Sequence, residues 1–83
     1  MNATADTQDE VAVSLWHAVA AANRVAQQRG WNVADSHISV TQAADGDWEV
    51  NYVPRQPAPQ RGGDLHVEVD AKTATVKRVL RGQ

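Results

Sequence analysis

Hydrophobic residues in the first third of the chain recur every three or four positions. The residues that keep this spacing are Val11, Leu15, Ala18 and Ala22. Side chains spaced in this way lie on one face of an α-helix. The sequence "TQDE" at residues 7–10 has the form of a capping box, and Gly30 is a typical residue just beyond a helix end. The pattern therefore predicts a helix over residues 8–29, preceded by a flexible polar tail at residues 1–6.

After Trp31 the hydrophobic period changes from about 3.6 to two, which is typical of half-buried β-strands. The segments with this alternation are "HISVTQ", "WEVNYV", "LHVEVD" and "ATVKRVL". One helix followed by four such strands predicts an α+β domain over residues 7–83. We expect one long N-terminal helix packed on a curved four-stranded antiparallel meander, in the order α-β-β-β-β. The small residues at 18–22 would let the helix nest closely against the sheet.

The register of the first hairpin is predicted from the requirement that the apolar side chains of its two strands lie on the same face of the sheet. A three-residue loop at residues 44–46 keeps the apolar residues of both strands on the same face, whereas a two-residue loop does not. The pairs that it predicts are Val40 with Val50, Ile38 with Tyr52, and Gln42 with Trp48. This loop length fits a type I turn followed by a bulge with a left-handed residue, here Gly46.

The last hairpin is predicted by the same rule to have a four-residue loop at residues 71–74. Val69 then meets Val76, and Glu68 meets Lys77 on the exposed face. This register turns Arg78 toward the core, unless a bulge intervenes or the side chain emerges at the edge of the sheet.

Composition narrows the classes of function. The chain has 83 residues, a formal charge of −2 and a pI near 5.8, which argues against a nucleic-acid-binding protein. No apolar run approaches the roughly 20 residues of a membrane-spanning helix, so no membrane insertion is expected. The first ten residues lack the pattern of a signal peptide. The chain is thus expected to be cytoplasmic if Met1 is native, and periplasmic or secreted if it is a mature fragment.

The predicted strands carry several titratable residues on their polar face. These are His37, Glu49, His66, Glu68 and Asp70. Their spacing is that of alternating exposed strand positions, and no motif of metal ligands, nucleophiles or phosphate-binding glycines accompanies them. We therefore expect no catalytic residue, no metal and no cofactor, and we interpret the chain as a non-enzymatic protein. The proline- and glycine-rich segment 54–63 is expected to form a mobile loop.

Two aliphatic residues interrupt the polar face that the strand pattern predicts. Val53 and Val79 would both lie there, which indicates that part of this face is covered. A homodimer joined through the sheet faces, or a different protein, would provide the cover.

Two segments of the chain resemble the second half of PepSY-type domains. They are "GDWEVNYVP" and, after the proline-rich stretch, "GGDLHVEVDAKTATVKRVLRG". In that family an aromatic-x-Val strand leads to a hairpin of the form x-V-x-V-D-x-x-T-G-x-V, after an alanine-rich helix. The likeness covers about residues 12–81, and the turn glycine of the family falls on Ala74, a position that we expect to be left-handed. The resemblance implies a stand-alone bacterial, extracytoplasmic module that binds proteins or peptides and regulates peptidases.

The expected fold is also similar to that of cystatins, which block cysteine peptidases with a Q-x-V-x-G hairpin. Residues 42–46 read Q-x-A-x-G at the matching hairpin. The residues that we select as candidate partner contacts are Gln42, Asp45, Gly46, Val53 and Val79. The predicted function is protein or peptide binding, by presentation of hairpin tips or by addition of a strand to a sheet edge. The alternative is a structural domain that dimerises through its exposed sheet face.

Overall fold

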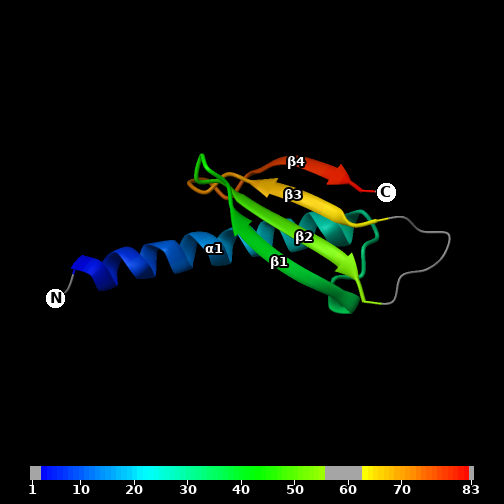
Figure 1. The fold of residues 1–83 in the computed structure, drawn as a ribbon, viewed down its shortest axis with the longest axis horizontal. Helices are drawn as coiled ribbons and strands as arrows, with labels where there is room; N and C mark the ends of the chain where they lie inside the picture. The colour runs from blue at the N-terminus through cyan, green and yellow to red at the C-terminus, as the bar shows by residue number, and fades with distance from the viewer. Residues whose placement is uncertain (1–2, 56–62, 83) are drawn as a thin grey trace.

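The computed structural model describes residues 3–55 and 63–82, which form one helical layer and one sheet (Figure 1). The elements are α1 (Ala3–Gln28), the short 3-10 helix η1 (Val33–Asp35), β1 (Ser36–Gln42), β2 (Trp48–Pro54), β3 (Leu65–Val69) and β4 (Val76–Arg81). The four strands form an antiparallel sheet in the order β1-β2-β3-β4. The α+β architecture is thus the predicted one. Most of the expected loop at 54–63 lies outside the described residues.

The start of α1 differs from the prediction. The helix begins at Ala3, so residues 3–6 are helical, and Thr7 lies within the helix instead of capping it. The segment has no glycine or proline to stop a helix, and alanine has the highest helix propensity of all residues. A capping-box sequence therefore does not mark the start of this helix.

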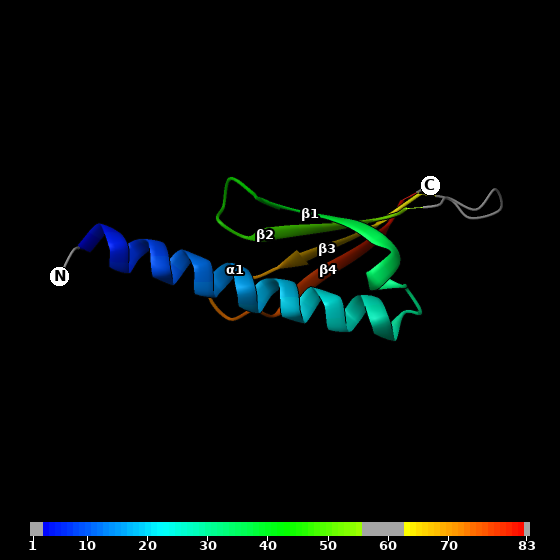
Figure 2. The same ribbon diagram turned by 90° about the horizontal axis from the view of Figure 1, so that it is seen from below.

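The end of α1 is closed by Gly30, as predicted. Gly30 has a φ of +80°, and its N–H donates to the carbonyl of Gln27, while the N–H of Trp31 donates to the carbonyl of Ala26. These two bonds form a Schellman motif, in which a left-handed glycine lets the chain leave the helix. The turn directs the chain into η1 and back along the helix as β1 (Figure 2).

The core lies between the inner face of the sheet and a line of alanines on α1. Ala18, Ala22 and Ala26 are fully buried, and they face the large side chains of β2 and β3. The buried side chains of the two strands are Trp48, Val50, Tyr52, Leu65, Val67 and Val69. Because alanine has a short side chain, the helix lies close to the sheet, and the strands supply most of the buried volume. The first turns of α1 extend past the end of the sheet (Figure 2).

The first hairpin has the register that face parity predicts. Val40 pairs with Val50, Ile38 with Tyr52, and Gln42 with Trp48. The N–H of Gly46 donates to the carbonyl of Ala43, and Gly46 has a φ of +96°. These features correspond to the three-residue loop with a left-handed glycine at its end.

The last hairpin contains a β-bulge that corrects two predictions. Val69 pairs with Val76 as expected, but the register then shifts, and Glu68 pairs with Arg78 instead of Lys77. Arg78 therefore points away from the core. The extra residue is Lys77, whose Nζ lies 2.5 Å from the carboxylate of Asp47 on the neighbouring hairpin.

The same shift moves Val79. It packs against the core on the helix side of the sheet and does not lie on the outer face, because the bulge reverses the orientation of every side chain after it. Leu80 takes the outward position that had been expected for Val79, and 44% of its surface is exposed.

Candidate binding edge

The predicted contact residues of the first hairpin, Gln42, Asp45 and Gly46, all take part in hydrogen bonds within the hairpin. The side-chain amide of Gln42 donates to the carbonyl of Gly46 at 2.9 Å, and the carboxylate of Asp45 accepts from the N–H of Asp47 at 3.0 Å. These local bonds stabilise the turn itself. They explain why Gln42, Asp45 and Gly46 occur in this order without a partner being involved.

The outer face of the sheet carries a row of polar side chains across β2, β3 and β4. Nδ1 of His66 lies 2.6 Å from Oδ1 of Asn51, and the Arg78 guanidinium donates to the carboxylate of Glu68 at 2.6 Å. The hydrogen bond from Arg78 holds the pKa of Glu68 below its usual value. Val53, which is 43% exposed, also lies on this face, where it is the partner of His37 in the neighbouring strand. Among the described residues no group of three or more His, Asp or Glu side chains is arranged to hold a metal ion.

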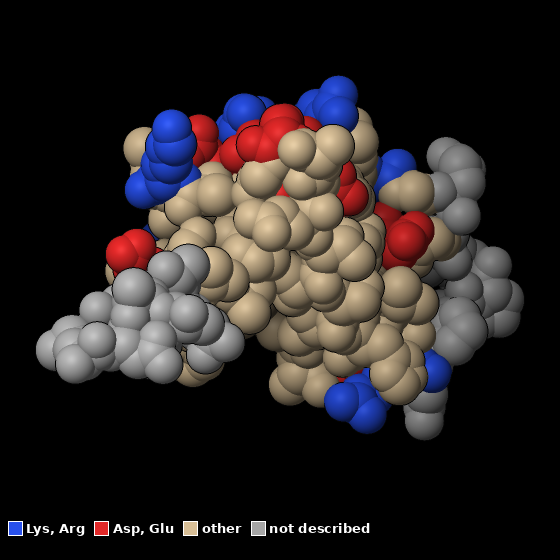
Figure 3. All heavy atoms as spheres, turned by 60° about the vertical axis from the view of Figure 1, so that its left-hand side comes forward, with Lys and Arg blue, Asp and Glu red and all other residues tan. Residues whose placement is uncertain are grey.

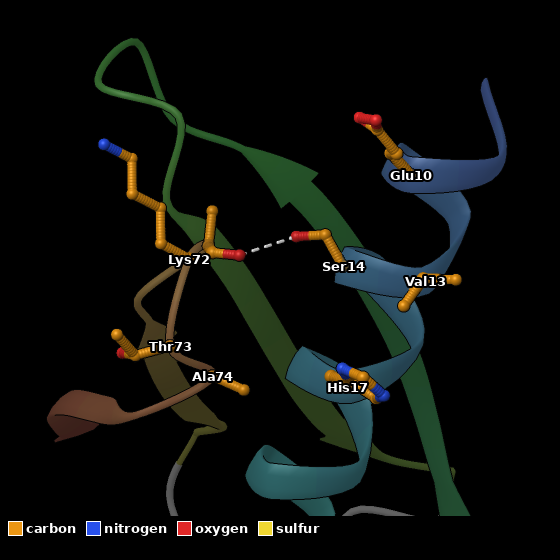
Figure 4. A pocket seen from close by; sticks show the side chains of 8 residues that line it. Glu10, Val13, Ser14, His17, Lys72, Thr73 and Ala74 are labelled. Carbon is orange, nitrogen blue, oxygen red and sulfur yellow. Dashed lines mark hydrogen bonds between the residues drawn. The ribbon is translucent and has the colours of Figure 1, made fainter. Parts of the chain in front are cut away.

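A groove of about 390 Å³ lies between α1 and the loop that joins β3 to β4 (Figure 4). Its lining includes Glu10, Ser14 and His17 from one side of the helix, which are residue types that occur in hydrolase sites. The hydroxyl of Ser14, however, donates to the carbonyl of Ala71 at 2.8 Å and accepts from the indole Nε1 of Trp48 at 2.9 Å. Both hydrogen-bonding roles of Ser14 serve packing, so this arrangement is that of a structural junction and not of an activated nucleophile.

The feature best suited to binding is the free edge of β1. The N–H of Ala43 donates to the carbonyl of Asp47, and the N–H of Arg55 donates to the carbonyl of Asp35. Peptide groups along a strand alternate in direction, so the odd-numbered residues of β1 face β2 and the even-numbered residues face outward. The N–H of Ser36 instead donates to the carbonyl of Val33. The outward N–H groups available to another strand are those of Ile38, Val40 and Gln42.

The two edges of the sheet differ in how well they discourage the addition of another strand. Natural edge strands are commonly protected by lysine, proline, bulges or inward charges. Edge strand β4 has a bulge and three basic residues, Lys77, Arg78 and Arg81. Edge strand β1, with the sequence "SHISVTQ", contains no Asp, Glu, Lys, Arg or Pro. Of the two edges of the sheet that the described residues form, only β1 therefore offers a regular and unprotected backbone edge.

Apolar side chains lie beside this edge on the inner side of the sheet. Ile38 of β1 is 41% exposed, although its partner Tyr52 is fully buried, because α1 packs mainly over β2 and β3. Trp16 is 73% exposed. It lies two helical turns before Asn23, on the same side of α1, and Asn23 accepts a 2.6 Å hydrogen bond from the hydroxyl of Tyr52. The opposite side of α1 carries Ser14, which bonds to Ala71 in the loop before β4, so the Trp16 side of α1 is turned toward β1.

Charged side chains do not cover the molecule evenly. In the face shown in Figure 3, most of the Lys, Arg, Asp and Glu side chains lie along the rim, and a broad central area has none. An uncharged surface of this kind is compatible with contact to another polypeptide.

Comparison with known proteins gives no assignment: no protein-family model matches the chain, and neither the curated proteins nor the solved structures yield a significant match. The described residues include no helix that is both long and apolar enough to cross a membrane.

The sequence contained a signal for the β1 edge that the prediction did not use. The predicted function includes strand addition at a sheet edge, but it does not say which of the two edges would bind. Trp16 is not one of the predicted contact residues. An uncharged strand at one end of a meander and a strongly basic strand at the other already distinguish the two edges.

Proposed function

We propose that this chain is a non-enzymatic protein-interaction module that binds an extended segment of another polypeptide by strand addition at the free edge of β1. The observation that carries the proposal is the combination of an unprotected edge strand with outward backbone groups and two exposed apolar side chains beside it, Ile38 and Trp16. In this mode of recognition, backbone hydrogen bonds supply affinity, and pockets for alternate side chains supply specificity.

The resemblance to PepSY-type domains and cystatins supports a peptidase, or a segment that a peptidase recognises, as the first class of partner to test. The hairpin that corresponds to the inhibitory tip of cystatins is less suitable than the edge. The Gln42 side-chain amide and the Asp45 carboxylate are already used within the turn. Their recruitment by a partner would require these bonds to break first.

The alternative function is that of a structural domain that dimerises through the outer face of the sheet. Val53 and Leu80 favour it, because both are aliphatic and more than 40% exposed on that face. The polar row of Asn51, His66 and Glu68 also lies on that face and would have to be desolvated in such an interface. The β1 edge has no comparable cost.

The test is to select peptides from a displayed random library on the wild-type chain and to measure their binding to Ile38→Pro. The N–H of Ile38 points outward, so proline removes a group that the sheet does not use, and proline is tolerated at such edge positions. We expect Ile38→Pro to keep its fold by circular dichroism and to bind the selected peptides at least about 10-fold more weakly, a loss of ~1.4 kcal/mol. The matched control Ile38→Thr keeps the N–H and should bind more strongly than Ile38→Pro.

Amide hydrogen exchange locates the bound peptide. The N–H groups of Ile38 and Val40 should exchange quickly in the peptide-free monomer and slowly in the complex. Binding that leaves these two amides unprotected, or that is lost in a Val53→Ser, Leu80→Ser double variant, would assign the interaction to another surface and refute the proposal.

A further inference from the structure

We infer that the strand that β1 accepts is β1 of a second copy of this chain, paired antiparallel about a twofold axis that passes through Ser39. The inference rests on the proposed function, because it names the partner for the same edge. Ser39 is the central residue of β1, which spans Ser36–Gln42, so pairing about it uses the whole length of the strand.

The backbone groups of two β1 strands are complementary in this register. Ile38 of one copy lies opposite Val40 of the other, and Ser36 lies opposite Gln42. The peptide groups of Ile38, Val40 and Gln42 point outward, as does the carbonyl of Ser36, so these are the hydrogen-bonded pairs of an antiparallel ladder. Each ladder pair exchanges two bonds, and only the Ser36 N–H is already used, by Val33. Ser39 faces its own counterpart at a position without hydrogen bonds.

The side chains are complementary as well. On the inner side of the sheet, Ile38 meets Val40 of the second copy, and such aliphatic cross-strand pairs stabilise a sheet. On the outer side, His37 meets Thr41. The strand has no Asp, Glu, Lys or Arg, so its pairing with itself brings no like charges together. The same arrangement at β4 would place Lys77, Arg78 and Arg81 beside their own copies.

The twofold axis also determines where the helices lie. Because paired residues of an antiparallel ladder point to the same face, both α1 helices lie on one side of a continuous eight-stranded sheet. α1 lies over β2 and β3, so at a strand spacing of about 4.8 Å the two helix axes are roughly 20 Å apart. Packed helices are separated by about 8–10 Å, which leaves a space between them. Trp16, Ile38 and Val40 from each copy border this space.

The test uses engineered cysteines, because the natural chain has none. In Ser39→Cys, the two Cα atoms lie about 4.5 Å apart across the axis, within the range that a disulfide spans. We expect this variant to oxidise rapidly to a species of twice the 9.0 kDa chain mass. Thr41→Cys is the matched control on the same strand and face. The Cα atoms at position 41 of the two copies are separated by four residues along the paired strands, which is about 13 Å. This variant should therefore not form a disulfide between the copies.

The double variant His37→Cys, Thr41→Cys tests the register a second time, because position 37 of one copy lies opposite position 41 of the other copy. It should crosslink although Thr41→Cys alone does not. The wild-type chain should have twice the monomer mass by light scattering, and Ile38→Pro should have the monomer mass. Trp16→Ala should keep its fold and shift the equilibrium toward the monomer.

Several outcomes would overturn the inference. They are a wild-type chain that stays monomeric at millimolar concentration, equal crosslinking of Ser39→Cys and Thr41→Cys, and an Ile38→Pro variant that still dimerises. The selected peptides show whether only the inferred dimer is wrong or whether the proposed function is wrong as well. If the chain is monomeric but those peptides still protect the Ile38 and Val40 amides, only the identity of the partner is wrong. If nothing protects these amides, both proposals fail.

Discussion

At the scale of the residue, Ala74 shows how a local conformation limits stability. It is the one non-glycine residue with a positive φ, +58°, in the described part of the chain. A residue with a Cβ pays about 1–2 kcal/mol for this conformation, whereas glycine adopts it freely. Glycine also gains freedom in the unfolded chain, which offsets part of the benefit. We expect Ala74→Gly to raise the free energy of unfolding by about 0.5 kcal/mol in urea titrations.

The matched control is Ala44→Gly in the other hairpin loop, because Ala44 is exposed and does not have a positive φ. Glycine at this position relieves no strain and only increases the entropy of the unfolded chain, so it should lower the stability. Equal effects of the two substitutions would show that the left-handed conformation of Ala74 carries no cost.

At the scale of the element, Ser14 joins α1 to β2 and to the loop between β3 and β4. Removal of its hydroxyl leaves the indole N–H of Trp48 and the carbonyl of Ala71 without this partner. The loss of a buried partner costs about 1–3 kcal/mol, and the higher helix propensity of alanine returns about 0.5 kcal/mol. We expect Ser14→Ala to lower the free energy of unfolding by about 1 kcal/mol.

Thermal or urea unfolding measures this change, and Ala20→Ser isolates the propensity term because Ala20 lies on the exposed side of the same helix. If Ser14→Ala were as stable as the wild type, the hydrogen bonds of Ser14 would contribute no more than the difference in helix propensity between serine and alanine.

The sequence predicted most of the sheet because side-chain parity determines its register. Burial of one face requires Val40 opposite Val50 in the first hairpin, and a shift by one residue would expose the whole set. The bulge at Lys77 was missed, although the sequence contains its signal. Val76 and Val79 are three positions apart, and both can face the core only if one extra residue lies between them.

Other features depend on interactions that sequence periodicity does not report. The start of α1 at Ala3 reflects continued helix propensity past a capping motif. The exposure of Trp16 depends on the lateral position of α1 over the sheet. That position results from the packing of the alanine line against β2 and β3, which no single segment encodes.

At the scale of the whole molecule, the offset of α1 makes the two sides of the fold unequal. On the side of β4, Val76, Val79 and Trp31 pack against the core, and the Arg81 guanidinium lies 5.6 Å from the centre of the Trp31 ring. On the side of β1, Val40 also packs against the core, but Ile38 is 41% exposed. α1 lies mainly over β2 and β3, so Ile38 at the β1 edge keeps more exposed surface than Val76 and Val79 on β4.

The stability of the whole fold should also decrease in strong alkali, because the helix and the sheet meet at Tyr52. This side chain is fully buried, and its hydroxyl donates to Asn23 of α1. Burial raises the pKa of Tyr52 from 10.0 to about 12. Between these values the unfolded chain releases the phenolic proton while the folded chain retains it, so the free energy of unfolding falls as pH rises. The contribution of Tyr52 is therefore constant below pH 10 and is lost between pH 10 and about 12.

Tyr52 is the chain's single tyrosine, so tyrosinate absorbance during a pH titration reports this group directly. Lys77, whose pKa is raised by its hydrogen bond to Asp47, also loses its charge in strong alkali, and Tyr52→Phe separates the two effects. The phenylalanine variant should be about 1 kcal/mol less stable at neutral pH, because Asn23 loses its donor. Its stability should nevertheless depend less on pH above 10 than that of the wild type. A tyrosine that ionises near pH 10 in the folded chain would show that water reaches the boundary between α1 and the sheet.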